Sequence, residues 1–168
     1  MLHNVPVARI LGFLFLGSVV LIGIVTYEGY RTSAGGLVAS VHIRFALFAI
    51  VVVLFTQTMT LFYFVGTGSR IKKVAQRYRL ATSFVERTRR LKARLFPWLT
   101  FTPLVTMAAF IIGGGAHTRV LPGWLHGLLA LLALAMNLIT TVVAVACLSD
   151  NIMLIEEIDA ALPETAPE

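Results

Sequence analysis

The apolar positions of the chain are gathered into four long runs, separated by segments that carry nearly all of its charge. The runs cover residues 10–27, 45–66, 96–116 and 120–149. A helix needs about 20 apolar residues to cross the hydrocarbon layer, so each run is long enough. Because every backbone group must be hydrogen-bonded inside a bilayer, such runs predict helices rather than barrel strands. We expect transmembrane helices at about residues 8–28, 38–66, 96–116 and 121–149.

The connections on one side of the membrane are short, near residues 28–36 and 117–123. Short connections make neighbouring helices antiparallel, which predicts an up-down-up-down bundle. No segment outside the membrane is long enough to build a second core. The expected fold is therefore an all-α integral membrane protein with one membrane domain over residues 1–168.

Composition supports the same class. The chain has 168 residues, of which 58% are hydrophobic and 13% are charged. A soluble domain of this size carries roughly twice that share of charged residues. A soluble globular domain is thereby excluded.

The net charge of +6 is unevenly distributed. Ten of the 14 Lys and Arg residues lie between Arg70 and Arg94. By the positive-inside rule this connection is cytoplasmic, so both termini are cytoplasmic too, as in a multi-pass protein of a bacterial-type inner membrane. A basic segment beside a membrane typically sets the topology and contacts anionic lipid, and is not typical of nucleic-acid binding.

The segment 69–95 shows an apolar face among its cations. Gly66 to Ser69 predict a helix stop and a fresh start, so we expect a separate amphipathic cytoplasmic helix between the second and third spans. It either lies on the inner leaflet or binds a partner, such as other subunits of a membrane complex. An acidic tail, residues 150–168, emerges on the same side, and we expect attraction between the two segments. The cations expected to contact lipid or a partner are Arg70, Lys72, Lys73, Arg77, Arg87, Arg89 and Arg90.

Two histidines lie near the outer ends of the second and fourth predicted helices. From His42 to Val65 is 23 residues, and from His126 to Leu148 is 22. At 1.5 Å per residue the two imidazoles therefore differ in depth by about 1.5 Å. Ionisable groups in membrane helices usually face the bundle interior. The second and fourth helices are diagonal neighbours in an up-down bundle, so the two rings are predicted to meet across its core.

Two neutral imidazoles at one depth are able to hold one haem iron from both sides. The layout resembles the four-helix core of the cytochrome b family, whose haem ligands also come from the second and fourth helices. The resemblance is one of arrangement. In that family the ligands recur fourteen residues further in and hold a second haem, whereas here those positions are Thr56 and Thr140. The resemblance thus implies one haem b, at the outer position.

The same resemblance implies room for the macrocycle and partners for its propionates. The family places glycines on the first and third helices, and Gly23, Gly113 and Gly114 are near the corresponding depth. Arg44 and Arg119, with Arg31, lie at the outer boundary and suit carboxylate binding.

Other functions stay open at this point. The histidines are also compatible with a headgroup-level location that needs no ligand, or with a path for protons or ions. The leading hypothesis is a single-haem electron carrier in a larger membrane complex. The alternatives are a haem-free scaffold that binds partners through the basic helix and acidic tail, and a channel or carrier. Since the sequence contains no nucleophile paired with a base and no phosphate-binding loop, we expect no enzyme, at most a non-catalytic redox subunit.

Overall fold

The computed structural model describes residues 5–33 and 39–162, which form four α-helices and no strand. The helices are α1 (Val5–Ser33), α2 (Ala39–Arg77), α3 (Ser83–His117) and α4 (Gly123–Ala160). The predicted all-α class and the number of helices are confirmed. The first residue of the predicted helix 38–66 and the last six residues of the acidic segment 150–168 lie outside the described residues.

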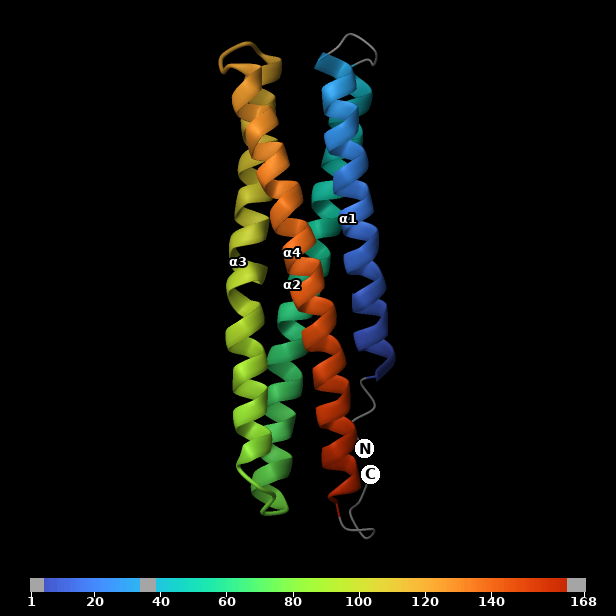
Figure 1. The fold of residues 1–168 in the computed structure, drawn as a ribbon, viewed down its shortest axis with the longest axis vertical. Coiled ribbons are helices and arrows are strands. Elements are labelled where there is room, and N and C mark those ends of the chain that lie inside the picture. Colours follow the sequence, from blue (N-terminus) through green and yellow to red (C-terminus); the bar gives the residue numbers. More distant parts are fainter. Residues whose placement is uncertain (1–4, 34–38, 163–168) are drawn as a thin grey trace.

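The helices form one elongated bundle. Each helix packs on two neighbours, in the cyclic order α1, α2, α3, α4 and back to α1, so α2 and α4 are diagonal across the core. Figure 1 shows the α2–α3 connection at one end of the bundle and the α3–α4 connection at the other. All four helices are long and apolar enough to cross a membrane, which indicates a multi-pass membrane protein.

The helix stop predicted at Gly66 is wrong, because α2 continues without a break from Ala39 to Arg77. The separate basic helix predicted over residues 69–95 is therefore absent. Its first part is the end of α2, its last part is the start of α3, and residues 78–82 connect them. Glycine permits a left-handed helix end but does not impose one.

The close packing of α3 against Gly68 explains why this position of α2 is a glycine. A Cβ on Gly68 would collide with the amine of Lys92 and lie 2.9 Å from Cγ2 of Thr88, both on α3. The missing side chain thus lets α2 and α3 approach closely, a common use of glycine in membrane helices. By contrast, a Cβ on Gly66 would meet nothing within 4 Å.

Three of the helices continue well past the length that a bilayer needs. The 38 residues of α4 span about 57 Å, against about 30 Å of hydrocarbon. Figure 1 shows α2, α3 and α4 reaching beyond the N-terminal end of α1. We call this extension, with the turn between α2 and α3, the stalk and define it as residues 67–95 and 150–160. It has its own buried cluster, Ile71, Leu154, Ile155 and Ile158, on which Val74, Leu80, Phe84 and Leu91 pack.

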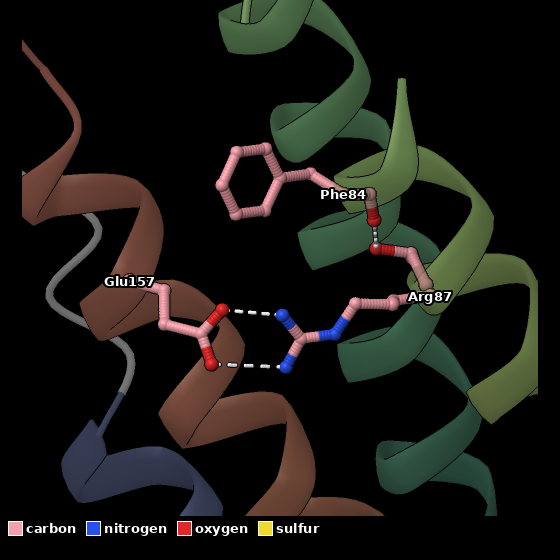
Figure 2. Close-up of polar contacts among 4 residues, drawn as sticks. Phe84, Arg87 and Glu157 are labelled. Atoms are coloured by element: carbon pink, nitrogen blue, oxygen red, sulfur yellow. Dashed lines mark hydrogen bonds and ion pairs between the residues drawn. The ribbon is translucent and has the colours of Figure 1, made fainter. Parts of the chain in front are cut away.

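Ion pairs connect the basic and acidic parts of the stalk. The guanidinium of Arg87 donates two parallel hydrogen bonds to the carboxylate of Glu157, one of them 3.0 Å from Nη2 to Oε1 (Figure 2). This bonding lowers the pKa of the Glu157 carboxyl. Arg94 and Asp150 form a looser pair, 3.9 Å apart. The first eleven residues of the predicted acidic tail are thus the helical end of α4, through Ala160, packed on α3, rather than a separate tail.

The hairpins α1–α2 and α3–α4 are related by a shift of 84 positions. Many residues 84 positions apart are buried in both hairpins. Examples in α1 and α3 are Leu11 and Leu95, Phe15 and Leu99, and Ser18 and Thr102; examples in α2 and α4 are Ala49 and Ala133, Thr56 and Thr140, Phe64 and Leu148, and Ile71 and Ile155. The bundle is therefore a pseudo-twofold arrangement of two similar hairpins.

The continuity of α2 gives a first prediction. Gly66→Ala should raise the free energy of unfolding by about 0.5–1 kcal/mol, because alanine loses less conformational entropy than glycine in a helix interior. Gly68→Ala should not show this gain, since the new methyl group displaces Lys92 and Thr88 on α3. Thermal unfolding of both variants in detergent, followed by circular dichroism, measures the difference. A destabilised Gly66→Ala protein would mean that α2 ends at this glycine.

Candidate functional site

The end of the bundle that carries the α3–α4 connection contains a large cavity. Its volume is about 1120 Å³, and residues from all four helices line it. Cofactor and ligand sites in proteins typically measure about 300–1,000 Å³, so this cavity has room for a bulky group. Its walls are mainly aliphatic and aromatic side chains, among which the polar groups are few. Two of those polar groups are the imidazoles of His42 and His126.

The two imidazoles meet across the bundle, as their matching depth predicted. His42 extends from α2 and His126 from α4, and their ring centroids are 6.3 Å apart with an interplanar angle of 66°. Both rings are partly buried. The interior of the bundle thus presents two nitrogen heterocycles to one space, from diagonal helices.

Each imidazole lies directly against a glycine of the preceding helix. A Cβ on Gly29 of α1 would be 3.0 Å from Cε1 of His42, and a Cβ on Gly113 of α3 would be 2.8 Å from Cε1 of His126. Real Cβ atoms essentially never make a contact as short as the one at Gly113, and the one at Gly29 is tighter than nine in ten real Cβ contacts. Both rings therefore need a bare Cα beside them in order to occupy their positions.

The second ring nitrogen of His126 has a defined partner. Nδ1 is 3.0 Å from the carbonyl oxygen of Ala109. A carbonyl only accepts hydrogen bonds, so in the neutral ring the proton is on Nδ1 and Nε2 keeps its lone pair. Histidines that bind metals are usually oriented in this way, by a bond from the other ring nitrogen to a carbonyl or carboxylate. His126 is thus arranged to offer Nε2 as a ligand.

His42 is less constrained than its counterpart. Its Nδ1 is buried and has no hydrogen-bond partner among the described residues. The residue that corresponds to Ala109 in the other hairpin is Val25, 84 positions earlier, and both residues line the cavity.

The other predicted site residues lie at different distances from the cavity. Gly113, Gly114 and Arg119 line it, and a Cβ on Gly114 would meet open space. Gly23 lies next to Ile22, which lines the cavity, but is not itself among the lining residues. Arg44 is exposed, and its Nε donates a 3.2 Å hydrogen bond to the carbonyl of Ser40.

The acidic residue closest to this region is Glu28, in the last turns of α1. Its carboxylate is mostly buried, with 19% of the side chain exposed, and is 3.7 Å from the guanidinium of Arg31. Arg31 is thereby paired within its own helix rather than turned into the cavity. Arg119 is thus the predicted arginine that the fold places at the cavity. It occupies a left-handed conformation, with φ of 62°, in the turn between α3 and α4.

A polar network forms the floor of the cavity. Asn137 of α4 donates a 3.0 Å hydrogen bond to the Oγ1 of Thr106, which lines the cavity, and accepts a 3.2 Å bond from Nε2 of Gln57 on α2. Its amide also donates to the carbonyl of Ala133. Bonds of this kind between membrane helices contribute about 0.6–2 kcal/mol each. They hold α2, α3 and α4 together immediately below the cavity.

Below this floor the bundle is filled by a layer of hydroxyl groups. Ser18 and Thr56 approach to 3.3 Å between α1 and α2, and Thr102 and Thr140 to 2.7 Å between α3 and α4. All four side chains are buried. Thr56 and Thr140 occupy the positions fourteen residues below the histidines, so packed side chains fill the depth at which a second haem would need open space.

Two features of the site are not among those predicted from the sequence. They are the glycine at position 29, Gly29, and the repeat of 84 positions between the two halves of the chain. Aligning the second half of the chain on the first places Gly113 on Gly29 and His126 on His42. This alignment is the feature of the sequence that identifies Gly29 as the counterpart of Gly113.

The contact between glycine and imidazole gives a second prediction. In Gly113→Ala the methyl group should push the His126 ring away from Ala109 and weaken its hydrogen bond. Gly114→Ala, one residue along the same helix, is the matched control because its methyl group enters open space. The chain has only four histidines, so their Cε1–H signals are readily assigned by NMR in detergent. The His126 signal should shift in Gly113→Ala and stay in place in Gly114→Ala; equal shifts would contradict the contact.

No family model, no curated protein and no solved structure matches the chain. What the cavity binds must therefore be inferred from its own residues. Those residues offer two imidazoles facing one apolar space, two glycines that make room for them, and one arginine at the rim.

Proposed function

We propose that the protein is a one-electron carrier that holds a single b-type haem between His42 and His126. The observation that carries this proposal is the separation of the two rings, 6.3 Å between centroids. An imidazole nitrogen lies about 1 Å from the ring centre and a metal–imidazole bond is about 2 Å long, so two rings on opposite sides of one metal have centres about 6 Å apart. The observed spacing agrees with this value.

A haem also suits the number of ligands better than a bare metal ion does. The described residues contain no group of three or more His, Cys, Asp and Glu side chains arranged around a common point. A structural zinc ion takes four protein ligands. Haem iron already has four nitrogen ligands from its macrocycle and needs two axial ones, which is the number that His42 and His126 supply.

The surrounding residues suit a flat apolar macrocycle with an acidic edge. The cavity of about 1120 Å³ is lined mainly by apolar side chains, and Gly114 leaves its part of the wall open. Arg119 lies at the rim, where a guanidinium binds carboxylates such as propionates by charge-assisted hydrogen bonds. Arg44 is the weaker candidate for this role, since it is bonded to Ser40.

The number of haems is expected to be one. The hydroxyl layer of Ser18, Thr56, Thr102 and Thr140 leaves no space for a second macrocycle at the inner depth. When bound, haem iron takes up and releases one electron. The chain's own residues supply the axial nitrogens, exclude water from the inner side, and orient His126 through Ala109.

The setting of this carrier follows the distribution of charge. In an up-down-up-down bundle whose basic connection is cytoplasmic, the cavity opens near the outer face of a bacterial-type inner membrane. A carrier with one haem near one face exchanges electrons on that side only. We therefore place its redox donor and acceptor at the outer face or in the outer leaflet, as parts of a larger membrane complex.

An absorption spectrum tests the proposal. Protein purified in detergent from haem-replete cells should show a reduced-minus-oxidised difference spectrum of the b type, with one haem per chain by pyridine assay. The signal should be lost in His42→Ala and in His126→Ala, because either variant removes an axial ligand.

His117→Ala is the matched control for this test, since His117 lines the same cavity from the end of α3 but does not face the other rings as a pair. It should keep the full signal. A colourless preparation with the normal helical content and melting temperature would rule out the electron-carrying role. Two haems per chain would rule out the single-site arrangement.

A further inference from the structure

The stalk separates opposite charges onto different helices. Its cations lie on α2, α3 and the turn between them, and its acidic residues lie mainly on α4. Only two cations, Arg87 and Arg94, form ion pairs across the stalk in the described residues, with Glu157 and Asp150. Seven further cations are exposed and have no carboxylate within ion-pair distance among those residues: Arg70, Lys72, Lys73, Arg77, Arg79, Arg89 and Arg90.

The pseudo-twofold relation shows that packing does not require these charges. Ile71 of α2 and Ile155 of α4 are equivalent positions, and both are buried in the stalk core. The exposed residues that follow have opposite signs: Lys72 corresponds to Glu156, and Lys73 corresponds to Glu157. These two exposed positions therefore accept either charge beside a buried isoleucine. Exposed charges also contribute little to stability, so their segregation points to a binding role.

The stalk continues the membrane helices outward, so the distance of each cation from the apolar run indicates whether lipid or protein is its partner. Each headgroup layer is about 5–7 Å thick. From Gly66, at the inner end of the apolar run, to Arg77 is 11 residues of continuous helix, or about 16 Å. Arg77 and Arg79 are therefore beyond the headgroups, whereas Arg70 is at their level. A helix lying flat on the leaflet would have placed all of these cations among lipid phosphates.

We propose that the tip of the stalk, Arg77 and Arg79, binds an acidic surface of a soluble protein on the cytoplasmic side. Complementary charge steers such an encounter and fixes its orientation, even where it adds little affinity. The acidic edge of α4 repels the same partner and so confines it to the α2–α3 side. This surface is independent of haem binding, because it lies at the opposite end of the bundle from His42 and His126.

A peptide-binding experiment on the full chain tests this surface. The protein is placed in nanodiscs of phosphatidylcholine alone or with added phosphatidylglycerol, and binding of a fluorescent polyglutamate peptide is followed by anisotropy. The tip variant is Arg77→Gln with Arg79→Gln. The matched control is Arg70→Gln with Lys72→Gln, which removes the same charge close to the bilayer.

The tip variant should weaken binding by about three- to tenfold and flatten its dependence on salt, while the control changes it by less than about twofold. Binding should persist in nanodiscs with phosphatidylglycerol and in His42→Ala, which separates this result from the outcome of the haem test. Equal effects of both variants, or loss of binding when phosphatidylglycerol is present, would assign the cations to lipid and overturn the proposal. Absence of binding to the unaltered protein would overturn it as well.

Discussion

The contact of each imidazole with the bare Cα of a glycine is the constraint on which the cavity-bearing half of the bundle depends. A ring on α2 or α4 reaches the interior only where the helix before it has no side chain, and Gly29 and Gly113 supply that space. Any Cβ there would force the ring toward lipid or toward its partner ring. The separation of 6.3 Å between His42 and His126 is therefore set by backbone positions on α1 and α3 as much as by the histidines.

The two halves of the bundle deal with buried polar groups in different ways. In the half of the bundle nearer the stalk, many buried hydroxyls bond the carbonyl four residues earlier, as Thr60 does with Thr56 and Thr67 with Tyr63. Such groups are satisfied without a ligand. The Nδ1 of His42 has no partner among the described residues and faces the cavity, whereas Oε1 of Gln57 and Oδ1 of Asn151 also lack a partner but belong to residues that do not line it. A buried polar atom without a partner is costly, so His42 is the one of these three residues that a ligand in the cavity would complete.

Much of the architecture could be predicted from the sequence. The features that could not be predicted all have the same cause. The length of each apolar run determines a helix, and the rise per residue determines the depth of His42 and His126. The role of a glycine, however, depends on what packs opposite it. Gly66 suggested a helix end and Gly23 a clearance site, whereas Gly68 and Gly29 are the glycines that face another helix closely. Such contacts depend on the rotation of neighbouring helices, which the apolar pattern leaves open.

The repeat of two hairpins explains why one chain has two matching glycine–imidazole contacts at the cavity and an asymmetric distribution of charge in the stalk. Positions that face the core are under the same steric demands in both hairpins, so Gly29 matches Gly113 and Ile71 is repeated 84 positions later. Exposed positions of the stalk are under no such demand, and there the two hairpins have opposite charge. Because the two ends are joined only through the packed and hydrogen-bonded middle of the bundle, ligand binding at one end and partner binding at the other depend on separate sets of residues.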